Sequence, residues 1–312
     1  MRVLVTGGLG YVGRIVTARL AVDRHEVTVL SRSAPGPDRP LPEGVTFALA
    51  DLLDRDRVGE VVTAGQFEGV CHLAGVTRVR ASFSDPVGTY TANVGGTLHL
   101  LEALAGSGVP VRFVFASTGA VYWADAPMPV DERAPAAPTS PYAASKLAVE
   151  HLLSFHAANG SIGAVSLRCF NVAGAVDDHG DPDPTRLIPR ALAVAAGRAP
   201  VLEVNGDGSA VREFVHVADL AGAYALALDA AQPGTHETLN AGSGTGVRVR
   251  DVIEMVTRVT GRAVPVSNGP PADEPQALVA DSGRIRERLG WQPVRSSMER
   301  IVRDAWMAVA PR

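Results

Sequence analysis

The chain has 312 residues, of which 46% are hydrophobic, so it is long enough for one large domain and a smaller lobe. Its 29 basic and 33 acidic residues give a net charge of -4 and form neither a basic stripe for nucleic acid nor a polybasic patch for a membrane. The sequence shows no leader before its first strand and no apolar run near the roughly 18 residues that span a bilayer. We therefore expect a cytoplasmic protein whose partners include no nucleic acid and no membrane.

The cysteines and histidines indicate neither a disulfide nor a metal site. Cys71 and Cys169 both lie in apolar stretches typical of strands, which predicts reduced packing residues. The histidines share no spacing with carboxylates or cysteines that would form a metal site, so they are interpreted as core or surface residues. No metal is expected.

Short apolar runs alternate with segments in which apolar residues recur at helical spacing. The predicted buried strands are residues 2–6, 26–30, 45–50, 69–73, 112–116 and 164–168. The predicted helices are residues 11–22, 54–64, 86–106 and 141–159. Strands that alternate with helices, and that are apolar throughout, are typical of the Rossmann class, a doubly wound parallel α/β sheet.

This alternation ends after residue 168. A Gly/Asp/Pro-rich segment, one predicted helix at 187–196 and loops near 205–209 and 265–275 follow. We predict a dinucleotide-binding domain and a smaller C-terminal α/β lobe that binds substrate. The predicted bounds are 1–170 for the domain, with 211–238 returning to it, and 171–210 and 239–312 for the lobe.

A glycine motif, Gly7-x-x-Gly10-x-x-Gly13, follows the first predicted strand and opens the first predicted helix. Glycines at this spacing allow a tight turn, a close approach to a pyrophosphate and close packing of helix on strand. The amides at the helix N-terminus then receive the phosphates. The motif predicts a dinucleotide site, with Tyr11 at the start of the helix among its contacts.

The residues after the second strand bear on the choice of cofactor. Enzymes that select NAD usually have an acidic residue here, which binds the ribose 2′-hydroxyl. This chain has Ser31 and Arg32, a hydroxyl and a guanidinium that suit a 2′-phosphate. A solvated Arg32 with no ligand is the alternative, so the sequence leaves NAD and NADP both open.

Two further strand ends are predicted to contact the cofactor from their position in the fold. Asp51 and Leu52 follow the third strand, and the Asp51 carboxylate is expected near the adenine amino group. Leu73, Ala74 and Gly75 end the fourth strand, where the backbone runs close to the dinucleotide.

Tyr142 and Lys146 are four residues apart on a predicted helix, so their side chains share one face. A free tyrosine, with a pKa of about 10, is a poor base at neutral pH. A neighbouring ammonium favours the phenolate and brings the pKa closer to the working range. The pair predicts proton transfer by Tyr142 beside a nicotinamide.

The motifs together resemble the extended short-chain dehydrogenase/reductase family, also described as NAD-dependent epimerases/dehydratases. Within it the chain looks most like the UDP-galactose (UDP-glucose) 4-epimerase group. The motifs are Thr-Gly-Gly-x-Gly-x-x-Gly at 6–13, Leu-Ala-Gly at 73–75, Asn-Val-x-Gly-Thr at 93–97, Ala-Ser-Thr-Gly-Ala-Val-Tyr at 116–122, Tyr142-x-x-x-Lys146, Arg-Cys-Phe-Asn at 168–171, Val-Arg-Glu-Phe-Val-His-Val-x-Asp-Leu-Ala at 211–221 and Leu-Gly-Trp at 289–291.

The resemblance implies roles in catalysis and cofactor binding. Tyr142 acts as catalytic base and acid, and Lys146 holds the nicotinamide ribose and lowers the pKa of Tyr142. Thr118 hydrogen-bonds the reacting oxygen, and Asn93 lies on the cofactor side. The implied reaction is a nucleotide-sugar 4-epimerisation of the UDP-hexose type, with reversible hydride transfer between sugar C4 and a tightly bound nicotinamide.

The resemblance also implies a substrate site and a dimer. Asn171 and Arg212 hold the nucleotide diphosphate, and Leu187 is expected beside them. The predicted helices 86–106 and 141–159 correspond to those that pair across a two-fold axis in relatives, which implies a homodimer.

Three departures from the family pattern concern the substrate and the cofactor. Pro270-Pro271-Ala272-Asp273-Glu274 stands where the family has an arginine that clamps the diphosphate. Trp123 replaces a common glycine near the sugar end, where it either narrows the pocket or turns outward. Ser31 and Arg32 are the third departure.

These departures leave other functions open. An NADPH-dependent 4-ketoreductase of a nucleotide-linked (deoxy)sugar or related metabolite would use the same Thr118, Tyr142 and Lys146. A 4,6-dehydratase is disfavoured, because its relatives carry Asp-Glu where this chain has Gly119-Ala120. A non-catalytic dinucleotide-binding sensor is a remote alternative, since such proteins commonly lose the tyrosine or the lysine.

Overall fold

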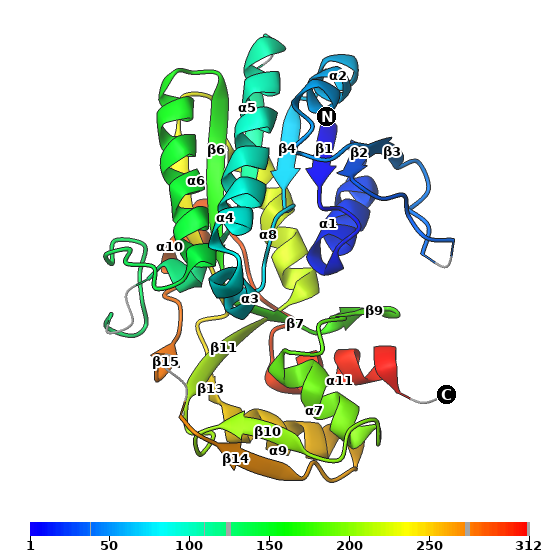
Figure 1. Cartoon of the computed structure of the whole chain (residues 1–312), viewed down its shortest axis with the longest axis vertical. Helices are drawn as coiled ribbons and strands as arrows, with labels where there is room; N and C mark the ends of the chain where they lie inside the picture. Colours follow the sequence, from blue (N-terminus) through cyan, green and yellow to red (C-terminus); the bar gives the residue numbers. More distant parts are fainter. Residues whose placement is uncertain (38, 109, 123–125, 272–274, 311–312) are drawn as a thin grey trace. The chain divides into compact units, whose positions relative to one another are not determined.

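A computed structural model describes residues 1–37, 39–108, 110–122, 126–271 and 275–310. Internal contacts divide the chain into two compact units, which are described separately here (Figure 1). The first unit comprises Met1–Trp123, Pro135–Arg168 and Ala221–Leu239. The second comprises Ala124–Ala134, Cys169–Leu220 and Asn240–Arg312.

The first unit contains a seven-stranded sheet in the order β12-β6-β5-β4-β1-β2-β3. Its strands are β1 (Arg2–Thr6), β2 (Glu26–Ser31), β3 (Thr46–Leu49), β4 (Gly69–His72), β5 (Val111–Thr118), β6 (Ile162–Cys169) and β12 (His236–Ala241). The pairs β1–β2, β2–β3, β1–β4 and β4–β5 are parallel. This order reverses direction between β1 and β4, as in a doubly wound sheet, so the predicted Rossmann class is confirmed.

The helices of this unit are α1 (Tyr11–Val22), α2 (Arg55–Gly65), α3 (Val79–Ser84), α4 (Pro86–Tyr90), α5 (Gly96–Gly106), α6 (Pro141–Ala158) and α8 (Val217–Ala230), which enters from the second unit. Helices α2, α5 and α6 pack together on the sheet through one core cluster, in which Leu100 and Leu153 meet Phe113 and Phe115. The short 3₁₀ turn η2 (Gly119–Val121) follows β5. Val149, Leu153 and Ala157 of α6 belong to this cluster.

The predicted helix at 86–106 is helical throughout, but a π turn, η1 (Thr91–Gly95), interrupts its α-helical geometry between α4 and α5. The Gly96 N–H donates to the carbonyl of Thr91, five residues back. The Thr97 hydroxyl donates to the carbonyl of Asn93 in this turn, and the Asn93 side chain accepts a hydrogen bond from the amide of Val76. Helix α3, just before it, was not predicted.

The second unit contains several small sheets. Its strands are β7 (Asn171–Ala173), β8 (Ala175–Val176), β9 (His179–Gly180), β10 (Leu202–Asn205), β11 (Val211–His216), β13 (Gly246–Arg248), β14 (Val266–Gly269) and β15 (Ala277–Leu278). Its helices are α7 (Leu187–Ala195), α9 (Val249–Thr260), α10 (Gly283–Leu289) and α11 (Met298–Val309). Buried residues of α7, α9 and α11 form its core, including Leu192, Val256 and Ile301.

One segment of the second unit differs from the sequence-based expectation. The predicted loop at 265–275 contains β14, which pairs in parallel with β10. All four residues of β14 are exposed, so the sequence has no apolar run that would identify a strand.

Among the described residues, no helix is both long and apolar enough to cross a bilayer.

Candidate functional site

The glycine motif forms a tight turn between β1 and α1. Gly7 has a φ of +73°, and a Cβ on it would lie 2.7 Å from the amide nitrogen of Ala74. A Cβ on Gly13 would lie 2.1 Å from the carbonyl oxygen of Gly7, so α1 can press against the turn only without a side chain there. No described side chain caps α1 at Gly10, and Tyr11 is half-buried in its first turn. The turn and the uncapped amides fit a bound pyrophosphate.

The predicted contacts after β2 and β3 lie at the carboxyl ends of those strands. Ser31 ends β2, and its carbonyl accepts a hydrogen bond from Ala50 at 3.0 Å, while Arg32 is exposed. Asp51 is also exposed, and its Oδ1 accepts a hydrogen bond from the Leu53 amide at 3.0 Å. Leu52 is half-buried and packs on the sheet core. These ends belong to the same edge of the sheet as the glycine turn, because the strands are parallel.

The segment after β4 is bonded to β1. The Leu73 amide donates to the carbonyl of Thr6 at 3.1 Å, and the Ala74 amide donates to the Thr6 hydroxyl at 3.3 Å. Gly75 has a φ of +147°. A Cβ on Gly75 would lie 2.5 Å from Asn93 Oδ1 and 3.6 Å from Lys146 Nζ. The structure therefore brings the segment after β4 close to two other predicted site residues.

Asn93 lies in the π turn and is 3% exposed. Its Oδ1 accepts a hydrogen bond from the Val76 amide at 2.7 Å, and its Nδ2 donates to Ser145 Oγ at 2.8 Å. Ser145 Oγ in turn donates to the carbonyl of Tyr142 at 2.7 Å. The side chain of Asn93 thus joins the segment after β4 to the first turn of α6, and its contact with a cofactor stays a prediction.

Helix α6 begins with features that fix its first turn. Pro141 is its first residue, and the side chain of Ser140 accepts a hydrogen bond from Ala143 as an N-cap. The backbone amide of Tyr142 donates to Ser82 Oγ at 3.2 Å, which ties α6 to α3. Lys146 is buried, with Nζ 4.8 Å from the centroid of the Phe115 ring.

Thr118 is the last residue of β5 and is 8% exposed. Its Oγ1 accepts a hydrogen bond from the Ala120 amide at 3.2 Å, which caps the 3₁₀ turn. Strand β5 and this turn both contact α6. Thr118, Tyr142 and Lys146 therefore come from contacting elements of the first unit.

A buried ion pair that the sequence did not predict involves the same two elements, β5 and α6, together with β6. Arg168 donates to both carboxylate oxygens of Glu150, at 3.0 and 2.6 Å, and Ser117 donates to the same carboxylate. Burial alone would lower the pKa of Arg168, but its hydrogen bonds to Glu150 and the charge of that carboxylate raise it above the ordinary value.

Of the four predicted substrate residues, Thr118 lies in the first unit and the other three lie in the second. Asn171 of β7 is exposed, and its Nδ2 donates to the carbonyl of Glu213 at 2.8 Å. Arg212 of β11 is half-buried and donates to the carbonyl of Pro275 at 2.9 Å. Strands β7 and β11 are parallel neighbours. Leu187 is the half-buried first residue of α7.

Two of the departures from the family pattern fall partly outside the described residues. Trp123 lies outside them, as do Ala272, Asp273 and Glu274. Pro270 is described, and its carbonyl accepts a hydrogen bond from the amide of Gly206 at 3.2 Å.

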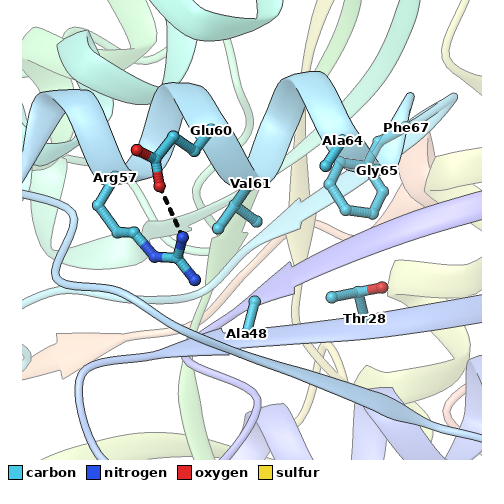
Figure 2. A pocket seen from close by; sticks show the side chains of 8 residues that line it. All are labelled: Thr28, Ala48, Arg57, Glu60, Val61, Ala64, Gly65 and Phe67. Atoms are coloured by element: carbon cyan, nitrogen blue, oxygen red, sulfur yellow. Dashed lines mark hydrogen bonds and ion pairs between the residues drawn. The ribbon is translucent and has the colours of Figure 1, made fainter.

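A surface hollow lies between α2 and the strands β2 and β3 (Figure 2). Arg57 and Glu60 form an ion pair of 2.6 Å at its rim. It is lined by Thr28, Ala48, Arg57, Glu60, Val61, Ala64, Gly65 and Phe67, none of which is a predicted site residue. Among the residues described, no group of His, Cys, Asp and Glu is arranged to hold a metal ion.

Comparisons with known proteins agree with this arrangement. A UDP-glucose 4-epimerase from Streptomyces lividans is 43% identical over 97% of this chain and 94% of its own. The crystal structure of the UDP-glucose 4-epimerase from Stenotrophomonas maltophila, with NAD and formylated UDP-arabinopyranose, superposes with a TM-score of 0.91 at 32% identity and covers 98% of this chain and 97% of its own. The corresponding enzyme from Brucella ovis, in complex with NAD, gives 0.91 at 34% identity, with 97% of each chain covered.

The family model agrees with these individual matches. The model of the NAD dependent epimerase/dehydratase family matches residues 3–242, which include the glycine turn, the π turn, α6 and β11. The chain belongs to the NAD dependent epimerase/dehydratase family.

Proposed function

We propose that the protein is a UDP-hexose 4-epimerase that interconverts UDP-glucose and UDP-galactose. The observation that carries this proposal is the 43% identity, over nearly the whole of both chains, to the UDP-glucose 4-epimerase of Streptomyces lividans. The glycine turn and α6 of this chain supply the residues that such a reaction needs. Reaction occurs by removal of a hydride from sugar C4 and its return to the opposite face of the 4-keto sugar.

The proposed cofactor is NAD. It supplies a hydride acceptor and donor when bound, and two similar structures contain it. In this proposal the phosphates lie at the turn of Gly7, Gly10 and Gly13 and at the amides of α1. The adenosine end lies near Ser31, Arg32, Asp51 and Leu52, and the remaining contacts come from Tyr11, Leu73, Ala74, Gly75 and Asn93.

Tyr142 is the proposed proton acceptor and donor for the sugar O4. The buried ammonium of Lys146 favours its phenolate and is also proposed to bind the nicotinamide ribose. Thr118 is proposed to hydrogen-bond the same oxygen and to align it with Tyr142. General acid–base catalysis of this kind contributes about 10²- to 10⁴-fold.

The second unit is proposed to bind the nucleotide part of the substrate. Arg212 and Asn171 come from neighbouring strands and offer a guanidinium and an amide to the diphosphate. Leu187 starts α7 beside them in our proposal. Since Pro270 and Pro271 stand where relatives have an arginine, Arg212 is proposed to carry most of the charge neutralisation.

A 4-ketoreductase that uses NADPH is the second candidate, and Ser31 and Arg32 are the observation that favours it. Arg32 is exposed at the end of β2, where a 2′-phosphate would be accessible to its guanidinium. Such an enzyme would release its dinucleotide after each turnover. Cofactor retention therefore separates the two functions.

We also propose a homodimer and a cytoplasmic location. Large apolar side chains are exposed on contacting helices of the first unit, including Val87 at 75% and Phe155 at 74%. Such side chains are typical of a surface that another subunit covers. Light scattering on the purified protein tests the dimer.

The proposed cytoplasmic location agrees with two free cysteines, which are typical of a reducing compartment.

The proposed function is tested on protein purified without added cofactor. After denaturation, the released dinucleotide is identified by mass, and the native protein is assayed for conversion of UDP-galactose to UDP-glucose. We expect NAD at one equivalent and conversion without added reductant. Empty protein that prefers NADPH, with no epimerisation, would instead support the ketoreductase.

A substitution pair then tests the role of Tyr142. Tyr142→Phe is expected to lower kcat by at least about 10²-fold. Tyr90→Phe makes the same change on α4 at a residue that is 41% exposed, and is expected to retain wild-type activity. Equal activity of the two variants would exclude Tyr142 as the acid and base.

A further inference from the structure

His72 is the last residue of β4 and is 1% exposed. Its ring centroid lies 5.8 Å from those of Phe113 and Phe115, with Phe115 stacked on it. Lys146 Nζ lies 4.8 Å from the centroid of the same Phe115 ring. An imidazole in such a position must have both nitrogens hydrogen-bonded, because water does not reach it.

Two threonines supply those hydrogen bonds. Nδ1 of His72 lies 2.7 Å from Thr6 Oγ1, and Nε2 lies 2.8 Å from Thr97 Oγ1. Thr6 ends β1 immediately before the glycine turn, and Thr97 is in the first turn of α5, immediately after the π turn. His72 therefore bridges two segments that are far apart in the sequence.

The direction of each hydrogen bond follows from its neighbours. The Thr97 hydroxyl donates its single hydrogen to the carbonyl of Asn93 at 2.6 Å, so its oxygen can only accept from His72. His72 thus carries its proton on Nε2, and its Nδ1 accepts from the hydroxyl of Thr6. The Thr6 oxygen accepts in turn from the amide of Ala74 at 3.3 Å.

This chain of hydrogen bonds requires a neutral imidazole. A second proton on Nδ1 would face the Thr6 hydroxyl, whose own hydrogen has no other acceptor among the described residues. Burial and, to a smaller extent, the charge of Lys146 lower the pKa of His72 to about 3. The imidazole is therefore neutral, with one fixed tautomer, throughout the neutral pH range.

The geometry points to His72 as a positioning residue for the dinucleotide: its two hydrogen bonds fix the spacing between the glycine turn, through Thr6 and Ala74, and the π turn, through Thr97 and Asn93. Asn93 continues the chain to Ser145 and to the carbonyl of Tyr142. These hydrogen bonds thus fix the position of the glycine turn relative to the first turn of α6. This inference rests on the proposed function for its ligand, NAD.

The first test measures NAD affinity by calorimetry after bound dinucleotide has been removed. His72→Leu replaces the imidazole with an apolar side chain of similar size and removes both of its hydrogen bonds. The matched control is His236→Leu, which removes a histidine–serine hydrogen bond of 2.9 Å, between His236 and Ser166, in the same unit. We expect the Kd for NAD to rise at least tenfold in His72→Leu and less than threefold in His236→Leu.

The second test holds even if His72→Leu fails to fold. Thr6→Val and Thr97→Val each remove one hydroxyl, on opposite sides of the imidazole. We expect each to weaken NAD binding, and the double variant to weaken it by less than the product of the two, because either change interrupts the same chain. A purely structural role would instead lower the melting temperature without coupling the two threonines in NAD affinity.

The outcomes separate this inference from the proposed function. NAD affinity of His72→Leu within twofold of wild type, or independent effects of Thr6→Val and Thr97→Val, would overturn the inference. Wild-type protein that binds NAD but does not epimerise would overturn the proposed function only. Wild-type protein with no affinity for NAD would overturn both.

Discussion

Two buried glutamates, one in each unit, are held in different ways. Glu150 of α6 is 3% exposed and is paired with the guanidinium of Arg168. Glu213 of β11 is fully buried, and among the described residues no lysine or arginine is paired with it. Its carboxylate accepts instead from the backbone amides of Gly244 and Ala280, at 2.6 and 2.5 Å.

The difference shows two ways to stabilise a buried carboxylate: by an ion pair or by backbone hydrogen bonds. The ion pair joins β5, α6 and β6 through side chains, and its charges compensate each other behind the proposed catalytic residues. The amides around Glu213 join β11 to the 242–244 turn and to the segment after β15. Burial raises the pKa of Glu213 although its backbone hydrogen bonds oppose this, so the second arrangement should respond to pH.

The largest expected effect comes from removal of the cation in the first unit. Arg168→Met leaves Glu150 buried without a charge partner, which costs about 3–5 kcal/mol in the free energy of unfolding. Urea denaturation followed by circular dichroism at neutral pH measures this loss. The effect should appear in the first unit, so NAD binding should fall as well.

A double variant checks the cause of that loss. Glu150→Leu combined with Arg168→Met removes both charges and replaces them with apolar groups, which is often nearly neutral for a buried pair. We expect the double variant to recover most of the stability lost in Arg168→Met. If it is less stable than the single variant, the pair contributes more than charge compensation.

Glu213→Ala should have a smaller effect than Arg168→Met. The substitution leaves the amides of Gly244 and Ala280 unsatisfied, which costs about 1–3 kcal/mol, but it also removes a desolvated charge. Urea denaturation gives the free energy, and calorimetry with UDP gives a separate reading of the second unit. A loss as large as that of Arg168→Met would mean that the two carboxylates are not held differently in energetic terms.

Ser117→Ala sharpens the comparison further, because it leaves the ion pair intact. It removes one hydroxyl donor from Glu150 while Arg168 keeps both of its hydrogen bonds. We expect a loss of about 1 kcal/mol, measured as a shift in the urea midpoint. A loss equal to that of Arg168→Met would assign the main role to the hydroxyl.

The smallest effect is a difference in pH dependence. A carboxyl whose pKa is higher in the folded protein contributes stability below its unfolded value, near 4.5 for Glu213, and loses it as pH rises through the folded value. The stability of wild type relative to Glu213→Ala should therefore fall as the pH is raised from 4.5. Urea denaturation of both proteins across that range measures the difference, and a constant or rising difference would contradict the raised pKa.

Much of the first unit could be predicted from the sequence for a simple reason. Its strands are buried runs such as β1 and β4, and its helices pack apolar faces on them, so burial leaves a clear pattern. A parallel sheet then gathers the strand ends at one edge, which is why the positions of Ala74 and Gly75 followed from the order of elements, whereas Thr118 was identified by the resemblance. The roles given to these residues stay predictions.

Other features had no local signal in the sequence. Strand β14 has only exposed side chains, and Asn93 in the π turn is hydrogen-bonded to Val76 and Ser145, which lie in other segments of the chain. The pair of Glu150 and Arg168 is formed across two elements, and charged residues are rarely expected in a core. Each of these features involves hydrogen bonds between separate segments of the chain, which the periodicity of apolar residues does not reveal.

The π turn at Thr91–Gly95 makes the site sensitive to the length of the chain. Each residue of an α-helix advances by about 100° around the axis, and a π turn contains one residue more than an α turn. Deletion of one residue there would turn α4 by that angle relative to α5 and move Asn93 away from Val76 and Ser145. The loss of one residue, about 50 positions before Tyr142 in the sequence, would then change which side chains face the first turn of α6.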